Sequence, residues 1–265
     1  MKRRSCKYLL TAALLCAALT LPAKAARRRV PVQADAIPVS AAAYVEQGVT
    51  YVPLRALLNA LGSWQVWWDG EAGQAAAISG SASLRADPAG NVIRVNGIAL
   101  SGRVTVESGV TYVPLRLVCE ALGCKVEWDP YLGGAAVTSP GAAYDAVELY
   151  WLSRIIYAES GAESMTGQIA VGNVILNRME SSRFPNTVEG VIFDRKDAVQ
   201  FEPVSNGQIY KTPSAQSMEA ARRVLDGENV IGSALYFYAP ALSQGVWINA
   251  SCTYQQTIGC HRFYL

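Results

Sequence analysis

The 265-residue chain contains a single histidine, His261, and only 17% of its residues are charged. A zinc-dependent amidase needs at least two histidines together with a carboxylate, so that chemistry is excluded. A serine or cysteine nucleophile would have to use the same histidine, and Cys260 cannot easily face the ring of its own neighbour. Glycine-rich phosphate-binding loops are missing as well. We therefore expect no metal and no cofactor, and the chemistry that remains is run by carboxylates.

Long apolar runs are missing except near the N-terminus, where residues 8–21 are apolar. This run follows the basic stretch 1–7 and precedes Ala23-Lys24-Ala25, which has the small-x-small form of a signal peptidase site. The three parts together predict a secretory signal peptide over residues 1–25. A membrane-spanning helix needs roughly 20 apolar residues, so we expect cleavage after Ala25, export, and no stable membrane anchor afterwards.

The excess of basic residues lies in the same segment. The whole chain carries 23 Lys and Arg against 21 Asp and Glu, a formal charge of +2. Five of these cations and none of the acids belong to residues 1–25, which leaves 18 against 21 and a charge of −3. A weakly acidic chain gives no reason to expect nucleic acid as a partner. With 51% hydrophobic residues, the remaining 240 residues suit two folded domains.

Four cysteines follow residue 25, an even number that is compatible with disulfides in an exported protein. Their closeness in sequence favours the pairs Cys119–Cys124 and Cys252–Cys260 over the two long-range connectivities. For Cys119, which lies in a helical pattern, a buried free thiol is an equally good interpretation. The sequence alone therefore leaves the connectivity open.

The first half of the mature chain contains an internal repeat. The sequence Val-Glu-x-Gly-Val-Thr-Tyr-Val-Pro-Leu-Arg occurs at residues 45–55 and again at 106–116, an offset of 61 residues. Each copy predicts a short strand (49–52 in the first), a proline at the first helical position, a helix (54–60), a glycine stop and a strand with a Trp-Asp pair. The later matches are Ala60–Gly62 with Ala121–Gly123, and Val66–Asp69 with Val126–Asp129.

The doubled Tyr-Val-Pro-Leu-Arg, Ala-Leu-Gly and Trp-Asp pattern resembles the copper amine oxidase N-terminal-like domain found on exported proteins of Gram-positive bacteria. The resemblance implies a non-catalytic α+β domain built from two repeats, which we place at residues 26–140. Residues 26–147 contain no histidine, so no copper site is expected despite the name of the family. Arginine and tryptophan side chains that occur in both copies are interpreted as requirements of the fold rather than as ligand contacts. They are Arg55, Arg116, Trp68 and Trp128.

The second half of the mature chain begins with a helical pattern over residues 148–160. Leu152, Ile155 and Ile156 lie on one face of this helix, and Glu159 projects from the same apolar side near the helix end. Partial desolvation there would favour the protonated carboxyl that a general acid for a glycosidic oxygen requires. An exposed helix-end glutamate without a function is the alternative that the helix geometry leaves open.

Six motifs around and beyond Glu159 resemble the SleB/CwlJ-type cell wall hydrolase family (spore cortex-lytic enzymes). The resemblance implies a lysozyme-like, lytic transglycosylase-like domain over residues 148–265, after a linker at 141–147. It also implies one catalytic glutamate at the end of the first helix, a role that falls on Glu159, and peptidoglycan glycan strands as the partner. The motifs are Ile156–Glu163, Gly167–Arg178, Arg183–Thr187, Val199–Val204, Ala234–Tyr238 and Ile258–Phe263.

In the implied mechanism Glu159 protonates the leaving glycosidic oxygen and then activates the C6 hydroxyl of the same sugar. Attack by water would instead give hydrolysis, and two-carboxylate schemes need a second acid. Glu163 is the nearest acid in sequence, but we interpret it first as an N-terminal residue of a helix over 163–180. The residues expected to bind substrate are Glu163, Asn177, Gln200, Phe201, Tyr236, Tyr238 and His261.

Several of these roles have a structural alternative. Tyr236 and Tyr238 share a strand face and form either a sugar-stacking wall or part of the core, and His261 is expected to orient its neighbours. The domain as a whole has the alternative of a non-catalytic wall protein that binds peptidoglycan without cutting it. The expected location is secreted, at the cell wall or spore cortex. The choice between cortex and vegetative wall stays open, as does a regulatory wall or spore protein as a second partner.

Overall fold

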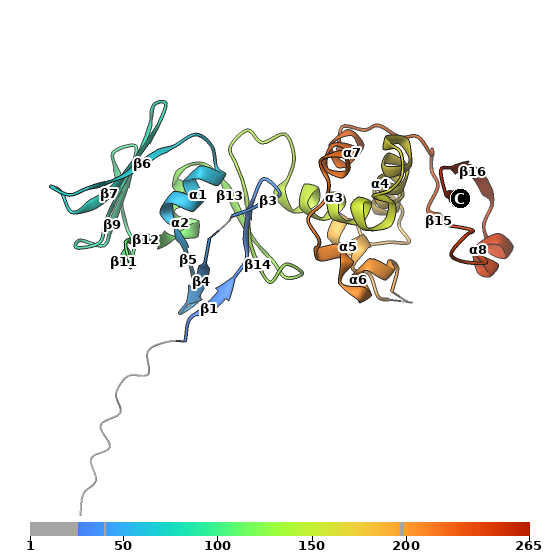
Figure 1. Cartoon of the computed structure of the whole chain (residues 1–265), viewed down its shortest axis with the longest axis horizontal. Helices are drawn as coiled ribbons and strands as arrows, with labels where there is room; N and C mark the ends of the chain where they lie inside the picture. The colour runs from blue at the N-terminus through green and yellow to red at the C-terminus, as the bar shows by residue number, and fades with distance from the viewer. Residues whose placement is uncertain (1–25, 40, 197–198) are drawn as a thin grey trace, which may run out of the picture.

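The computed structural model describes residues 26–39, 41–196 and 199–265, which form two bodies arranged along the long axis of the molecule (Figure 1). The predicted signal peptide, residues 1–25, lies outside the described residues. The first body holds most of the strands and the second holds the long helices, so the α+β class is confirmed.

The N-terminal body consists of three sheets and two short helices. Its elements are β1 (Arg28–Val30), β2 (Val32–Ala34), β3 (Ile37–Pro38), β4 (Ala43–Glu46), β5 (Val49–Pro53), α1 (Leu54–Ala60), β6 (Gln65–Asp69), β7 (Gln74–Ser79), β8 (Ala82–Asp87), β9 (Val92–Val95), β10 (Ile98–Ser101), β11 (Thr105–Glu107), β12 (Val110–Pro114), α2 (Leu115–Ala121), β13 (Lys125–Asp129) and β14 (Gly134–Thr138). The sheet orders are β1-β4-β5-β12-β11, β10-β9-β8-β7-β6 and β13-β14-β2-β3. Strands β6 and β13, which carry the Trp-Asp pairs, therefore both lie at a sheet edge.

The two repeats meet at strands β5 and β12, which pair antiparallel through equivalent residues. Val52 faces Val113, and these two positions are 61 residues apart, as in the sequence repeat. The tyrosine before each valine faces the proline after the other valine. This register places an approximate two-fold axis between β5 and β12, so that features of one repeat have counterparts across the axis.

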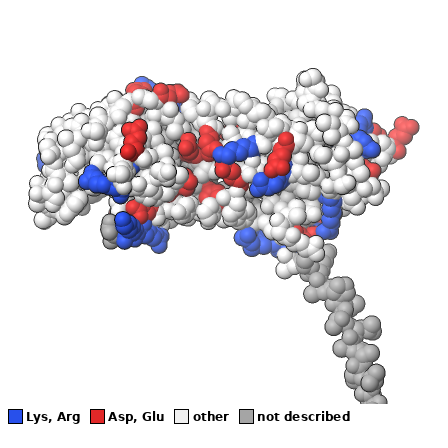
Figure 2. All heavy atoms as spheres, turned by 180° about the vertical axis from the view of Figure 1, so that it is seen from behind, with Lys and Arg blue, Asp and Glu red and all other residues white. Residues whose placement is uncertain are grey.

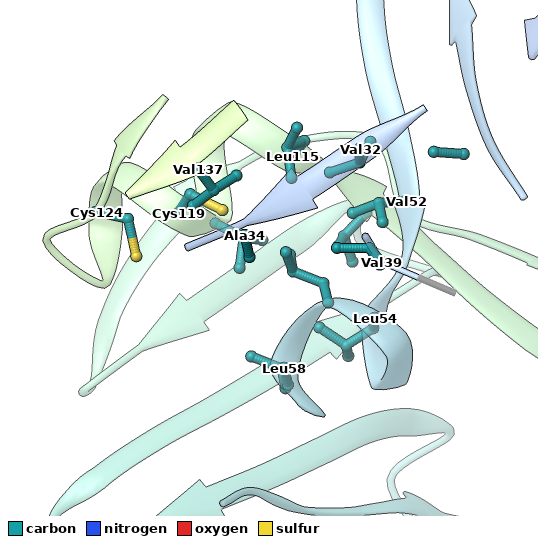
Figure 3. Close-up of a cluster of buried hydrophobic side chains, with 14 of the residues drawn as sticks. Val32, Ala34, Val39, Val52, Leu54, Leu58, Leu115, Cys119, Cys124 and Val137 are labelled. Atoms are coloured by element: carbon teal, nitrogen blue, oxygen red, sulfur yellow. The ribbon is translucent and has the colours of Figure 1, made fainter. Parts of the chain in front are cut away.

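Helices α1 and α2 follow β5 and β12 directly and supply the core of the N-terminal body. Positions i, i+3 and i+4 of each helix face the same way, and all six side chains are buried. Helices of seven residues need such packing to persist. The structure corrects one detail, because each proline is the N-cap and the last strand residue rather than the first helical residue. The buried side chains, several of them labelled in Figure 3, are Leu54, Leu57, Leu58, Leu115, Val118 and Cys119.

The C-terminal body is mainly helical and closes with a three-stranded sheet of order β15-β17-β16. Helix α3 packs on α4 and α7, and at Gly172 of α4 a Cβ atom would lie 2.8 Å from Ile156 and 2.9 Å from Val224. This glycine therefore permits the close packing of α4 against α3 and α7. The elements are α3 (Ala146–Ser160), α4 (Met165–Glu180), α5 (Val188–Ile192), α6 (Glu202–Asn206), η1 (Gln208–Tyr210), α7 (Ala215–Leu225), β15 (Tyr236–Tyr238), α8 (Val246–Ser251), β16 (Tyr254–Ile258) and β17 (His261–Tyr264).

The start of helix α4 differs from the prediction. The hydroxyl of Ser164 accepts the backbone N–H of Gly167, which makes Ser164 the N-cap. Helix α4 thus begins at Met165, and Glu163 lies outside the helix instead of in its first turn. The carboxylate of Glu163 instead accepts the backbone N–H of Cys260, in the turn between β16 and β17.

Neither expected disulfide is present, because Cys119, Cys124, Cys252 and Cys260 are all free thiols in the structure. The side chains of Cys119 and Cys124 share a hydrogen bond. The other two cysteines lie at opposite ends of β16, whose five residues span roughly 16 Å. Since bridged cysteines have Cα atoms within about 7 Å of each other, closeness in sequence was misleading for the second pair.

The tip of the β13–β14 hairpin joins the two bodies. Asp129 is only 1% exposed and accepts the indole N–H of Trp151 on α3 at 2.7 Å. The same carboxylate accepts the backbone N–H groups of Tyr131 and Leu132 at 2.9 and 3.0 Å. The ring of Tyr131 stacks on Phe193, with centroids 4.0 Å apart. The hairpin of the second repeat is therefore docked on the first helix of the C-terminal body.

Charged side chains of both signs lie interspersed on the face of the molecule shown in Figure 2. Several of them form ion pairs at the surface, such as the pair of Lys125 with Asp145. Exposed pairs of this kind each contribute at most about 1 kcal/mol.

In the part of the chain that the structure describes, no helix has the length and apolar character needed to cross a membrane.

Candidate active site

Helix α3 places Glu159 in its last turn. The side chain of Asp145 caps the other end of the helix by accepting two backbone N–H groups. Leu152, Ile155 and Ile156 are fully buried, as the sequence predicted, so this face of the helix is fixed on the core. Glu159 follows on the same side and is half-buried.

Two cavities meet at Glu159. One of about 450 Å³ lies among residues of α4, α6, β15 and β17. The other, of about 460 Å³, lies between the end of α3 and the segment 208–211. Both are lined by Ala158, Glu159 and Gln208, so the two cavities adjoin at these residues, and we refer to them together as the two arms of one cleft. A cleft of this shape suits a linear polymer that lies across the Glu159 carboxyl group and extends into both arms.

The surroundings of Glu159 favour its protonated form. Burial and, as the smaller cause, the like charge of Glu202 together raise the pKa of Glu159 to about 7. Glu202 is the first residue of α6 and lines the first cavity. Near neutral pH the Glu159 carboxyl is therefore present in both states, which suits a group that acts first as an acid and then as a base.

A buried arginine holds two of the predicted site residues in the first cavity. Burial lowers the pKa of Arg178 to about 10, so its guanidinium remains charged at neutral pH. Its Nε donates to the carbonyl of Leu235 at 2.8 Å, and its Nη1 donates to Oε1 of Gln200 at 3.2 Å. The guanidinium also lies 5.2 Å from the ring centre of Phe201. Gln200 and Phe201, both predicted to bind substrate, line the cavity.

Glu163 and His261 lie close together although each lines a different arm of the cleft. Glu163 lines the second cavity and His261 the first, with Nδ1 of the imidazole 4.0 Å from the Glu163 carboxylate. The backbone N–H of Cys260 donates to the same carboxylate at 3.2 Å. Gly259 has a positive φ of 56°, and a side chain there would collide with Glu163. Burial lowers the pKa of His261, so the imidazole is neutral at pH 7 despite the nearby acid.

The remaining predicted residues separate into two groups. Tyr238 lines the first cavity. Tyr236 lines neither of the two arms in the described structure, and its ring packs edge-on against Trp247 at 5.5 Å. The amide of Asn177 donates to two backbone carbonyls of residues 232–234 at 2.8 Å. Asn177 thus holds the turn before β15, outside both arms.

Comparisons with known proteins assign each body to a family. Residues 162–264 match the cell wall hydrolase family. The C-terminal body is a cell wall hydrolase domain. Residues 32–138 match the copper amine oxidase N-terminal domain, so both resemblances seen in the sequence are confirmed. The hydrolase domain therefore follows a repeat domain that contains no histidine, and that donor set does not fit copper.

Relatives of the hydrolase domain occur among spore proteins. The spore cortex-lytic enzyme of Bacillus cereus is 39% identical over 105 residues, which is 40% of this chain and 39% of that protein. The enzyme of Bacillus subtilis is 35% identical over 113 residues, 43% of this chain and 36% of that protein. The solved catalytic domain of the germination-specific lytic transglycosylase SleB from Bacillus anthracis is 36% identical and covers 48% of this chain and 99% of that chain, with a TM-score of 0.43. The chain spans about two fifths of the length of the two spore enzymes.

The cleft of the hydrolase domain contains polar residues that the sequence interpretation missed. Glu202, Asn206 and Gln208 all lie between the start of α6 and η1, and all line the first cavity. The signal for Glu202 was present, since it directly follows Gln200 and Phe201 in the family motif. The acid whose charge raises the pKa of Glu159 is thus more than 40 residues away in the chain and is not Glu163, the acid that follows Glu159 most closely in sequence.

Proposed function

We propose that the hydrolase domain is a peptidoglycan glycosidase that cleaves the MurNAc–GlcNAc strand as a lytic transglycosylase, with Glu159 as its acid and base. The observation that carries this proposal is the position of the Glu159 carboxyl, with a pKa of about 7, where the two arms of the cleft meet. The spore cortex-lytic enzymes and SleB support the same substrate class. The site of action that follows is the cell wall or the spore cortex.

The first step uses the protonated carboxyl of Glu159. It donates its proton to the glycosidic oxygen as the bond from C1 of the sugar to that oxygen breaks. The leaving sugar departs as an alcohol, and positive charge develops at C1. The half-buried setting of Glu159 keeps the proton available near neutral pH because the ionised form is poorly solvated.

The second step uses the carboxylate that remains. It takes the proton from the C6 hydroxyl of the same sugar, and O6 forms a bond to C1, which gives a 1,6-anhydro end. The proton is then back on Glu159, so one carboxyl group completes the cycle without water. Gln200, Asn206 and Tyr238 supply hydrogen-bonding groups in the first arm for the hydroxyl and acetamido groups of the strand.

Glu202 is the second carboxylate of the cleft, and we assign it an electrostatic role. Its charge raises the pKa of Glu159 and so favours the acid form needed for the first step. In a two-carboxylate inverting mechanism the same residue would instead activate water. The two roles differ in the products and in the effect of Glu202→Gln.

The test is a digestion of purified sacculi and of spore cortex with residues 26–265, followed by mass analysis of the released fragments. We expect anhydro-muramoyl ends from the wild type and none from Glu159→Gln, with the variant folded by circular dichroism. Fragments with reducing ends would show that the domain hydrolyses the strand with water instead of acting as a transglycosylase. A folded wild-type protein that binds the wall and releases nothing would establish the non-catalytic binding protein instead.

A further inference from the structure

The repeat domain contains two grooves related by the approximate two-fold axis. Each groove lies between the helix and Trp-bearing edge strand of one repeat and the β-turn of the other repeat. The first groove, of about 770 Å³, is formed by Arg55, Asn59, Trp67, Trp68, Val110 and Thr111 among others. The second, of about 580 Å³, contains the equivalent residues Arg116, Glu120, Glu127, Trp128, Val49 and Thr50.

The tryptophans of these grooves are partly exposed, so part of each indole remains available for a ligand besides what the fold buries. Trp67 and Trp68 are 40% and 48% exposed, and Trp128 is 45% exposed. A side chain that only served the core of its repeat would be buried, since burying an indole is strongly favourable. Exposed indoles in a groove are instead typical of surfaces that receive a ligand.

The charges of the two grooves differ in a way that singles out the first. In the second groove Arg116 pairs with Glu120 at 3.1 Å and also donates to the carbonyl of Val126. The first repeat has Asn59 in place of Glu120 and Trp67 in place of Glu127. Arg55 is therefore the one charged residue among those that line the first groove, and the described residues offer it no ion-pair partner.

We propose that the first groove binds the glycan strand of peptidoglycan and anchors the protein to the wall. The flat faces of Trp67 and Trp68 match the C–H faces and acetyl methyl groups of N-acetylated sugars. The guanidinium of Arg55, which forms no ion pair within the described part of the chain, matches a carboxylate carried by the strand or its peptides. A guanidinium binds a carboxylate with two parallel hydrogen bonds. Asn59 adds an amide for sugar hydroxyls. In the second groove both cations, Arg103 and Arg116, already pair with acids, Glu46 and Glu120, so neither guanidinium is left for a carboxylate of the strand.

The choice of ligand rests on the proposed function of the neighbouring domain. If the hydrolase domain works on an insoluble glycan, a second site for the same polymer on the same rigid molecule raises its effective concentration at the cleft. The docked hairpin of Asp129 holds the two domains together, so both sites are presented to the wall at once.

The experiment measures sedimentation of the full chain, residues 26–265, with purified insoluble peptidoglycan at 4 °C, with Glu159→Gln in every sample. We expect Trp68→Ala and Arg55→Ala to weaken binding at least fivefold, and the matched changes Trp128→Ala and Arg116→Ala to weaken it less than twofold. Trp68→Tyr, which keeps an aromatic face, should restore binding to within twofold of the starting protein. Equal losses from the two sets of variants, or no loss from either, would overturn the proposal.

A second measurement separates this site from the proposed activity. Without the Glu159 change, Trp68→Ala should cleave short soluble glycan fragments at the wild-type rate and release products from insoluble wall more slowly. If the wild type cleaves nothing but its binding still depends on Trp68, the proposed activity fails and the groove stands. If cleavage depends on Glu159 while Trp68→Ala leaves both binding and release from insoluble wall unchanged, the groove fails and the activity stands.

Discussion

The carboxylates of the two domains have opposite surroundings. In the repeat domain, burial by itself would raise the pKa of Glu46, but ion pairs with Arg27 and Arg103 bring it below its usual value. In the hydrolase domain, burial and the like charge of Glu202 raise the pKa of Glu159 to about 7. A buried acid that serves the fold is compensated by a partner, whereas the acid in the cleft is left uncompensated. The direction of the pKa shift therefore indicates a catalytic site better than the number of acidic residues does.

The largest expected effect is on Glu159 itself. Glu159→Gln removes the proton donor, so cleavage of sacculi should fall by about 10²–10⁴-fold, the usual contribution of a general acid or base. The folded-state pKa lies above the ordinary value of 4.5, so the fold loses stability as the pH rises from about 4.5 through about 7. Glutamine removes this loss, and we expect the free energy of unfolding at pH 8 to rise by roughly 1–3 kcal/mol.

The matched control for this prediction is Glu120→Gln in the repeat domain. Glu120 is exposed and paired with Arg116. An exposed ion pair contributes little to stability, so the rate of cleavage by Glu120→Gln should stay within about twofold of the wild-type rate. Denaturant unfolding at pH 5 and pH 8 reports the stability of both variants. If Glu159→Gln cleaved sacculi at the wild-type rate, Glu159 would not be the catalytic acid.

The second prediction concerns two equivalent aspartates, one in each repeat. Asp129 is buried and accepts the indole N–H of Trp151 together with two backbone N–H groups, so Asp129→Ala should cost roughly 2–4 kcal/mol of stability. Asp69 is its counterpart and accepts from Ala72 and Arg85 near the surface. Asp69→Ala should be much milder.

Thermal unfolding of the two variants, with cleavage assayed alongside, makes the comparison. Because the Asp129 hairpin docks on α3, its loss should also slow cleavage, while the loss of Asp69 should not. Equal stability losses in the two variants would mean that the hairpin tip does not hold the domains together.

The third prediction concerns Glu202 and the pH dependence of cleavage. Cleavage needs protonated Glu159, so the rate should decline above about pH 7. Glu202→Gln removes a like charge, lowers the pKa of Glu159 and moves this decline to lower pH, by less than burial contributes because burial is the larger cause. The rate on the acid side of the profile should remain within about threefold. Loss of activity at every pH would instead make Glu202 the base of an inverting mechanism.

The smallest expected effect is at His261. Burial lowers its pKa, so the folded state holds the neutral imidazole and loses stability as the pH falls below about 6.5, where the unfolded chain takes up the proton. His261→Gln should therefore flatten the decline of Tm between pH 6.5 and 5 and change little at pH 8. An unchanged slope in that range would show that Glu163 stabilises the charged imidazole as much as burial opposes it, and a steeper decline would show that Glu163 outweighs burial.

Much of the fold was predictable because it depends on local pattern. The helix over 54–60 has the predicted bounds, and the buried face of α3 at Leu152, Ile155 and Ile156 follows from the spacing of apolar residues. The start of α4 was predicted wrongly because acid preference at a helix N-terminus was weighed above the capping hydroxyl of Ser164. The pairing of Cys252 with Cys260 was wrong because an extended strand separates residues that are close in sequence.

The sequence by itself determined the repeat, the lack of histidine in the repeat domain, and the helix that carries Glu159, since each depends on residue type and short-range spacing. Only the tertiary structure decided which acid acts on Glu159, because Glu202 reaches the cleft from a separate helix. It also decided that Asp129 contacts the hydrolase domain whereas its counterpart Asp69 does not, and that the repeated tryptophans are partly exposed. These are properties of surroundings made by segments far apart in the chain, and periodicity carries no information about them.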